Sequence, residues 1–194
     1  MNIGIDIDNV ISNFDEVLKK EFLIHDKELR NTGIINPEAP MTKGMFDWTD
    51  DEIYTFYLEN IGRITPSLDV IEGAKEYIEK IKNDGHTIVI ITGRDKRIFK
   101  NPKEVTKEWL EKNNIYYDEL VFKKTPNKIE ECKNYKVDIM LDDLAINVKK
   151  LRENNVNAYL VRTRYNENYS LNMPMLLNWE DIYNFIKKMK SEEK

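Results

Sequence analysis

Short apolar runs alternate with amphipathic stretches along almost the whole chain. The run TIVII at Thr87–Ile91 is continuous and rich in β-branched residues, which is typical of a strand buried on both faces of a sheet. Similar but weaker runs predict strands at Asn2–Ile7, Glu119–Phe122, Val137–Leu141 and Asn157–Val161. Amphipathic patterns between and after them predict helices at Ile71–Asp84, Lys103–Asn113, Asn127–Asn134, Leu144–Asn154 and Trp179–Met189. This alternation predicts an α/β fold, a Rossmann-like parallel sheet flanked by helices on both faces.

The chain between the first two predicted strands is too long for a simple connection. A strand–helix–strand unit needs only ~30 residues, and one predicted helix already supplies the crossover. The surplus holds two further helical patterns, Glu16–Ile24 and Asp50–Asn60, around a turn-rich middle. A structureless loop of this length is unusual in a compact domain. We therefore expect a small helical cap inserted after the first strand, with the cap at residues 16–68 and the core domain at residues 1–15 and 69–194.

Polar residues stand where three of the predicted strands end. These residues are Asp6 and Asp8, then Thr92 and Gly93, then Asp142 and Asp143. Each group alone is weak evidence, and Asp142 alone could simply cap the helix that follows it. The carboxyl ends of parallel strands meet at one edge of a sheet, and ligands of such sheets bind there. Their joint placement therefore predicts one functional site.

Composition and charge narrow the classes of function. The chain of 194 residues is long enough for one domain with a sizeable core. Its net charge of -5 and sequence pI of 5.3 argue against general binding to nucleic acid polymers or to anionic membranes. The single cysteine, Cys132, excludes an internal disulfide framework and favours a cytoplasmic protein. No apolar run approaches the ~20 residues of a membrane span. A homodimer is left open.

Four short motifs, in order, resemble those of the haloacid dehalogenase (HAD) superfamily. They are DIDNV, IITGR, a following lysine, and MLDD. The size, the insertion after the first motif and the stretch VTKEWLEKNNIYYDELVF further resemble the 5'(3')-deoxyribonucleotidase branch and its bacterial relatives. Two features depart from that branch. Asn9 stands where glycine often follows the second aspartate, and TGR replaces a motif that contains serine, so the identity of the substrate stays open.

The resemblance implies roles for the aspartates. Asp6 would be the nucleophile that attacks phosphorus and forms an aspartyl-phosphate. Asp8 would be the general acid and then the general base. Mg²⁺ would be held by the Asp6 carboxylate, the backbone carbonyl of Asp8, and Asp142, because this hard ion prefers oxygen ligands. Asp143 would stand behind this ligand set, acting through water or by holding the lysine.

The remaining motif residues would bind phosphate. The resemblance gives that role to Thr92 and to the backbone N–H of Gly93, while a lysine would neutralise charge that develops in the transition state. Lys128 fits the family's position for this lysine, and Lys124 is the alternative. Arg94 is expected to contact the cap, a carboxylate or solvent rather than the phosphate of the substrate.

The predicted cap carries a cluster of aromatic residues, namely Phe46, Trp48, Tyr54, Phe56 and Tyr57. Core packing is the ordinary interpretation of such a cluster. The functional interpretation is a wall for base stacking above the site, supplied by Phe46 and Trp48.

Together these features predict a Mg²⁺-dependent phosphomonoesterase acting on a small phosphate ester, foremost a (deoxy)nucleoside monophosphate. A sugar phosphate is the alternative substrate, because cap residues set specificity and the core does not. Two other classes stay open, a phosphoacceptor domain of the receiver type and a binding module without catalysis. The order of the motifs in a receiver domain differs from the order in this chain. In a receiver domain the threonine and the lysine follow the phosphoacceptor strand, whereas here the pair of aspartates comes last.

Overall fold

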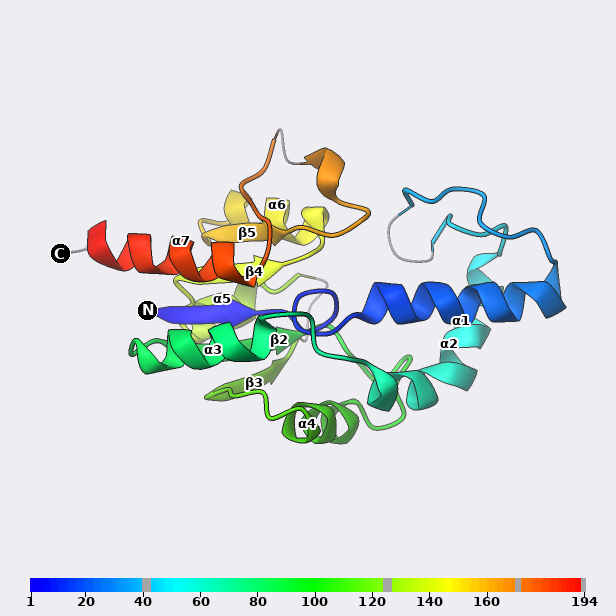
Figure 1. The fold of residues 1–194 in the computed structure, drawn as a ribbon, viewed down its shortest axis with the longest axis horizontal. Helices are drawn as coiled ribbons and strands as arrows, with labels where there is room; N and C mark the ends of the chain where they lie inside the picture. Colours follow the sequence, from blue (N-terminus) through cyan, green and yellow to red (C-terminus); the bar gives the residue numbers. More distant parts are fainter. Residues whose placement is uncertain (40–42, 124–126, 170–171, 193–194) are drawn as a thin grey trace.

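A six-stranded parallel sheet forms the centre of the molecule in the computed structural model, which describes residues 1–39, 43–123, 127–169 and 172–192 (Figure 1). The strand order is β3-β2-β1-β4-β5-β6. The strands are β1 (Asn2–Ile5), β2 (Thr87–Thr92), β3 (Glu119–Phe122), β4 (Ile139–Asp142), β5 (Ala158–Val161) and β6 (Met175–Leu176). All five predicted strands are present within a few residues of their expected bounds, while the two-residue β6 was not predicted.

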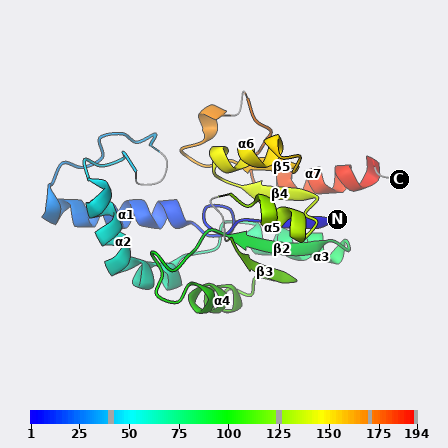
Figure 2. The ribbon, with the colours of Figure 1, turned by 180° about the vertical axis from the view of Figure 1, so that it is seen from behind.

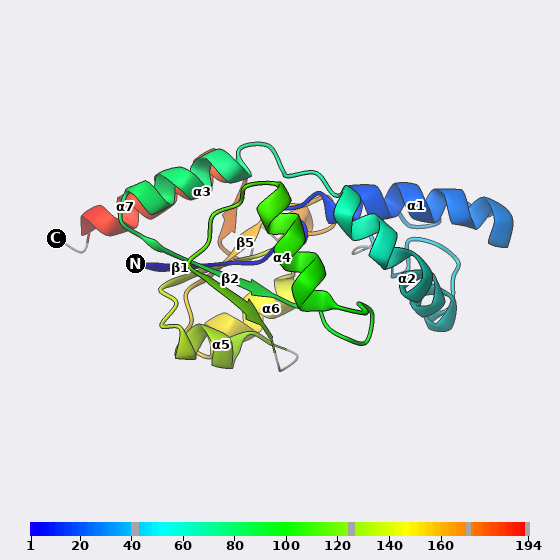
Figure 3. The same ribbon diagram turned by 90° about the horizontal axis from the view of Figure 1, so that it is seen from below.

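Helices cover both faces of the sheet, as the alternating pattern predicts. They are α3 (Ala74–Asn83), α4 (Pro102–Lys112), α5 (Ile129–Asn134), α6 (Ala145–Glu153) and α7 (Trp179–Glu192). Figure 3 shows α3 and α7 on one side of the sheet and α5 and α6 on the other. The side chains of β2 alternate accordingly: Ile88 and Ile90 join the core cluster beneath α3 and α7, and Val89 and Ile91 join the one beneath α5 and α6. The run is apolar throughout because both of its faces are covered.

The insertion after β1 consists of α1 (Phe14–Leu29), α2 (Asp50–Ile64) and the chain between them. Figures 1 and 2 show both helices extending away from the sheet at the end toward which β1 points. The start of α2 follows from its sequence, because Thr49 and Glu52 form a reciprocal capping box. Helix α1 is longer than predicted at both ends, and it crosses the proposed boundary at residue 16, so one continuous helix joins core and cap. None of the helices in the described ranges is long and apolar enough to span a membrane.

Candidate active site

Two aspartates and a lysine meet at the carboxyl edge of the sheet. Asp6 follows β1, Asp142 ends the neighbouring β4, and Lys128 immediately precedes α5. The Nζ of Lys128 donates to Oδ1 of Asp6 at 2.5 Å and to Oδ2 of Asp142 at 2.8 Å. The side chains of Lys128 and Asp142 are fully buried, and that of Asp6 is nearly so. The strand order therefore brings Asp6 and Asp142 together, although they are 136 positions apart in the sequence. The ammonium of Lys128 donates to both carboxylates.

Burial shapes the ionisation of this pair of carboxylates. Burial raises the pKa of Asp6 to about 6, with Asp142 and Asp8 acting in the same direction and Lys128 in the opposite one. Burial alone would lower the pKa of Lys128, but the carboxylates of Asp142 and Asp6 more than offset this, so its pKa is raised. Lys128 is therefore a permanent ammonium within a buried group that carries more negative than positive charge.

Asp142 also contacts the segment where α6 begins. Its Oδ1 accepts the backbone N–H of Leu144 at 2.9 Å and the side-chain amide of Asn147 at 3.1 Å. Leu144 is the N-cap residue of α6, and among the described residues no side chain caps this helix, so Asp142 is not a helix cap. One oxygen of Asp142 holds Leu144 and Asn147, and the other accepts from Lys128.

Asp143 directly follows β4 and belongs to a hydrogen-bonded network. Its Oδ2 accepts from the hydroxyl of Tyr165 and, at 3.0 Å, from the amide of Asn9, and Asn166 donates to its backbone carbonyl at 2.8 Å. Burial raises the pKa of Asp143, and Asp142 and Asp6 raise it further. This network was not predicted, because Tyr165 and Asn166 lie far along the chain from the motifs.

The network explains the departure at Asn9. This residue has φ of 65°, in the left-handed region where glycine is the usual residue and asparagine is the side chain best tolerated. Unlike glycine, Asn9 adds contacts: its amide reaches Asp143, and its Oδ1 accepts the backbone N–H of Asp15 at 2.6 Å. The substitution therefore keeps the backbone turn and ties the first motif to the fourth.

Asp8 is paired with Arg94 rather than with the Lys128 group. The guanidinium donates through Nε to Oδ2 of Asp8 at 3.0 Å and through Nη2 to Oδ1 at 2.6 Å. The hydroxyl of Ser12 donates to Oδ1 at 3.1 Å. Of the contacts expected for Arg94, the structure selects a carboxylate.

The second motif contributes the turn at the end of β2 to the site. Thr92 is fully buried, and its Oγ1 accepts the N–H of Arg94 at 3.2 Å. A side chain at Gly93 would meet Cε of Lys123 at 3.0 Å, so glycine permits Lys123 to lie over this turn. Lys124, the alternative catalytic lysine, lies outside the described residues.

A cavity of about 300 Å³ opens above these groups. Asp6, Asp8, Gly93 and Lys128 lie at its polar end. Its other lining residues include the apolar and aromatic side chains of Phe14, Tyr57, Ile61, Ile98 and Phe99. Thr92 and Asp142 are not among its lining residues. The cavity therefore joins a charged floor to walls supplied by α1, α2 and the segment between β2 and α4.

The structure does not bring Phe46 and Trp48 to this cavity. Both are buried within the insertion, where Trp48 stacks on Phe22 at 4.4 Å between ring centroids and donates its indole N–H to Asp26 at 2.8 Å. The structure therefore does not place them as a stacking wall of this cavity, because both side chains belong to the hydrophobic core cluster that continues from the sheet into the insertion. Tyr57, which belongs to the same aromatic cluster, is the ring that lines the cavity.

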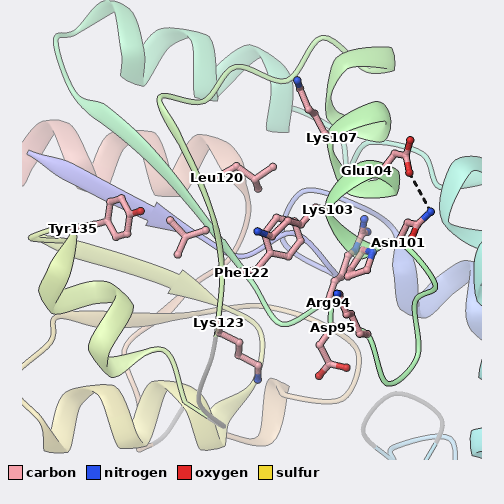
Figure 4. Close-up of a pocket in the computed structure, with 13 residues that line it drawn as sticks. Arg94, Asp95, Asn101, Lys103, Glu104, Lys107, Leu120, Phe122, Lys123 and Tyr135 are labelled. Atoms are coloured by element: carbon pink, nitrogen blue, oxygen red, sulfur yellow. Dashed lines mark hydrogen bonds between the residues drawn. The ribbon is translucent and has the colours of Figure 1, made fainter.

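A larger hollow of about 880 Å³ lies beside the first, along α4 and β3 (Figure 4). It shares Arg94 and Lys123 with the smaller cavity but contains neither Asp6 nor Asp8. The reactive groups therefore point to the smaller cavity as the catalytic one.

The carboxylates suit a hard cation. Among the described residues, no three His, Cys, Asp or Glu side chains converge as a ready-made metal cluster. Mg²⁺ needs no such cluster, because it commonly binds through one or two carboxylates together with waters and substrate phosphate. Asp6 and Asp142 both approach a single cationic nitrogen, which shows that these two carboxylates can converge on one positive charge.

The fold of this chain is similar to that of solved hydrolases of the HAD superfamily. A HAD-family hydrolase from Deinococcus radiodurans matches 96% of this chain and 95% of its own, with a TM-score of 0.70 and 7% identity. The HAD-like hydrolase SP0104 from Streptococcus pneumoniae matches 95% of this chain and 97% of its own, with a TM-score of 0.68 and 13% identity. These two similarities establish the fold.

The chain belongs to the NT5C family, described as "5' nucleotidase, deoxy (Pyrimidine), cytosolic type C protein", whose model matches residues 1–192. The "Putative nucleotidase YqfW" of Bacillus subtilis is 24% identical over 168 residues, covering 86% of this chain and 83% of its own length. The "Putative 5'(3')-deoxyribonucleotidase" of Chlorobaculum tepidum is 25% identical over 199 residues, covering 95% of this chain and 89% of its own length. The predicted enzyme class, a hydrolase of the nucleotidase type, is thereby confirmed.

Proposed function

We propose that this protein is a Mg²⁺-dependent 5'(3')-deoxyribonucleotidase that hydrolyses (deoxy)nucleoside monophosphates through an aspartyl-phosphate on Asp6. The observation that carries the proposal is the buried group of Asp6, Lys128 and Asp142, of which Asp6 and Lys128 line a cavity that Asp8 also lines. A nucleophile, a fixed ammonium and a second carboxyl group are what phosphate-ester hydrolysis requires at one point. The family's description as cytosolic supports a cytoplasmic location.

The first half-reaction transfers phosphorus to the protein. An oxygen of the Asp6 carboxylate attacks the phosphorus, the bond from phosphorus to the ester oxygen breaks, and its electron pair stays on that oxygen. Asp8 acts as the general acid and gives a proton to the same oxygen, and the nucleoside leaves as an alcohol. Lys128 stays charged throughout and lowers the cost of bringing a phosphate dianion next to Asp6.

The second half-reaction restores the enzyme. Asp8, now a carboxylate, takes a proton from a water molecule as the water oxygen attacks phosphorus. The bond between phosphorus and the Asp6 oxygen breaks, which releases inorganic phosphate and returns the Asp6 carboxylate. The N–H of Gly93 and the Thr92 turn would bind phosphate oxygens in both steps.

The residues that would hold Mg²⁺ are the Asp6 and Asp142 carboxylates and the backbone carbonyl of Asp8. When bound, the ion supplies positive charge that offsets the repulsion between the carboxylates and the phosphate. Asp143, held by Tyr165 and Asn9, would support this ligand set from behind.

The walls of the cavity support a nucleoside rather than a sugar as the leaving group. Tyr57, Phe14 and Phe99 present aromatic rings to the cavity, and a base can stack on an aromatic ring whereas a sugar has no π-face. The names of the relatives from Bacillus subtilis and Chlorobaculum tepidum point in the same direction. A sugar phosphate remains the second candidate substrate, because the polar residues that line the cavity do not by themselves discriminate between leaving groups.

The test is a panel of nucleoside monophosphates and sugar phosphates assayed with the purified chain, with Mg²⁺ and with chelator. We expect release of inorganic phosphate from nucleotides only when Mg²⁺ is present. Asp6→Asn removes the attacking charge at almost constant shape, so turnover should fall by several orders of magnitude while circular dichroism is unchanged. Full activity of this variant would refute the proposal, as would wild-type activity that is the same with chelator as with Mg²⁺. A preference for sugar phosphates would make a sugar phosphate the proposed substrate instead of a nucleotide.

A further inference from the structure

Among the residues that the structure describes, the most deeply buried cation outside the Lys128 group is Arg94, and it is paired with the proposed general acid. The side chain of Arg94 is 1% exposed, whereas that of Asp8, which it grips with two hydrogen bonds, is 21% exposed. A buried guanidinium is costly unless it is paired and its donors are used. Arg94 therefore sits where its planar fork has one main partner, and that partner is Asp8.

A cradle of three side chains holds the guanidinium from behind. Phe99 and Trp109 lie 5.7 and 5.9 Å from it, measured from the ring centroids to Cζ, which is within cation–π range. Thr106 accepts a hydrogen bond from Nη1 at 3.4 Å. Figure 4 shows Arg94 below α4, near Asn101, at the end of the second motif. The orientation of Arg94 is thus set by α4 and the segment before it, which belong to the core and not to the insertion.

We propose that Arg94 is a positioning residue, which holds the carboxyl group of Asp8 in the orientation needed to transfer a proton to the leaving oxygen. This inference rests on the proposed function. A carboxylate has about four lone-pair sites. Arg94 uses two of them and Ser12 a third, so one site remains, and Asp8 lines the catalytic cavity. The pair therefore fixes the plane of the carboxyl group and leaves one direction for proton transfer.

Two other roles would use the same contacts. Arg94 could bind the phosphate of the substrate, since it also lines the cavity, or it could only brace the fold. Both roles predict that its loss affects every phosphate ester alike. Positioning of a general acid predicts a selective loss, because an alkoxide leaving group needs a proton whereas a nitrophenolate leaves without one.

The experiment compares kcat/KM for a nucleoside monophosphate and for p-nitrophenyl phosphate in the Arg94→Lys and Arg94→Ala variants. This parameter reports events up to the departure of the alcohol, so slow release of phosphate from Asp6 does not obscure it. We expect Arg94→Ala to lose about 10- to 100-fold with the nucleotide, within the contribution of a general acid, and far less with p-nitrophenyl phosphate. Added guanidinium ion should restore part of the loss in Arg94→Ala, and Arg94→Lys should lie between that variant and the wild type.

Two companion variants make the result decisive. Arg97 lies in the same segment and pairs with Asp95 at the surface, so Arg97→Ala should leave both substrates unchanged. Asp8→Asn should show the same selective loss as Arg94→Ala, with a larger magnitude. If Asp8→Asn is selective and Arg94→Ala is not, only the inference on Arg94 fails. If neither is selective, the role of Asp8 in the proposed function fails with it. An equal loss for both substrates in Arg94→Ala, with or without a lower melting temperature, also overturns the inference.

Discussion

At the scale of the single residue, Lys128 supplies the positive charge that offsets the buried carboxylates of the site. Its side chain is 2% exposed, and its ammonium lies between the carboxylate of Asp142, which is fully buried, and that of Asp6, which is nearly so. Removing one member of a buried ion pair leaves the other charges uncompensated, which is far more costly than losing the attraction between the members. The stability of the chain and its catalytic charge balance therefore depend on the same side chain.

Lys128→Met should accordingly lower the free energy of unfolding by about 3–5 kcal/mol, measured by urea denaturation in the presence of chelator. Mg²⁺ should recover more stability in this variant than in the wild type, because the ion would supply the missing positive charge. Lys107 is exposed on α4 and pairs loosely with Glu111, so Lys107→Met serves as the control and should stay within about 0.5 kcal/mol of the wild type. Equal effects of the two substitutions would contradict this assignment of charge.

At the scale of the secondary-structure element, the aromatic residues of the insertion fall into two groups. Some pack against one another inside the protein, and others line the cavity. Phe22 on α1 packs against Phe46, Trp48 and Phe56, with ring centroids 4.4 to 5.6 Å apart. One residue after Phe56, Tyr57 lies on the side of α2 that lines the cavity. Neighbouring positions on one helix thus serve the core of the insertion and the wall of the site.

Tyr57→Ala should therefore reduce kcat/KM for a nucleoside monophosphate by about 5- to 150-fold, the value of one base stacked on a ring at 1–3 kcal/mol, with little loss for a small alkyl phosphate. Trp48→Ala should instead lower the stability of the protein by about 3–5 kcal/mol and affect both substrates alike. Tyr54, on the same helix but largely exposed, provides the control substitution. A selective loss in Trp48→Ala, with none in Tyr57→Ala, would return the stacking role to the buried tryptophan.

The same aromatic cluster shows where prediction from the sequence ends. Periodicity and strand-end chemistry are local signals, and they sufficed to place Asp6 and Asp142 at one edge of a parallel sheet. Which of several aromatic residues faces the cavity depends on how α1 packs on α2, and no spacing along the chain encodes that angle. Asp143 contacts Asn9, which lies 134 residues before it in the sequence. It also contacts Tyr165, which lies in the loop after β5. Such contacts follow from the fold and not from the motifs that define it.

Core and insertion are connected at the scale of the whole molecule by more than the chain itself. Arg164, which follows β5, donates to both oxygens of Asp15 in the first turn of α1, at 3.0 and 2.9 Å. Its Nη1 also donates to the carbonyls of Pro37 and Ala39, the second at 3.2 Å. One guanidinium from the core thus holds the start of α1 and the segment after it. The neighbour of Arg164 in sequence, Tyr165, contacts Asp143, so this connection leads directly to the site.

Arg164→Ala should loosen the insertion without unfolding the core. We expect hydrogen exchange to become faster in residues 31–39 and 43–48, where Ile35 and Asn36 donate to the carbonyl of Met45, while the amides of β1 and β2 keep their protection. Arg162 lies two residues earlier, and its half-exposed side chain makes a long contact with Glu167 at 3.8 Å, so Arg162→Ala should leave exchange unchanged. Unchanged exchange in Arg164→Ala would mean that the aromatic core of the insertion, and not the contact with the core domain, sets its stability. Faster exchange that also extends into β1 and β4 would make Arg164 a support of the whole fold, because protection in the central strands reports global opening whereas protection in the insertion reports local opening.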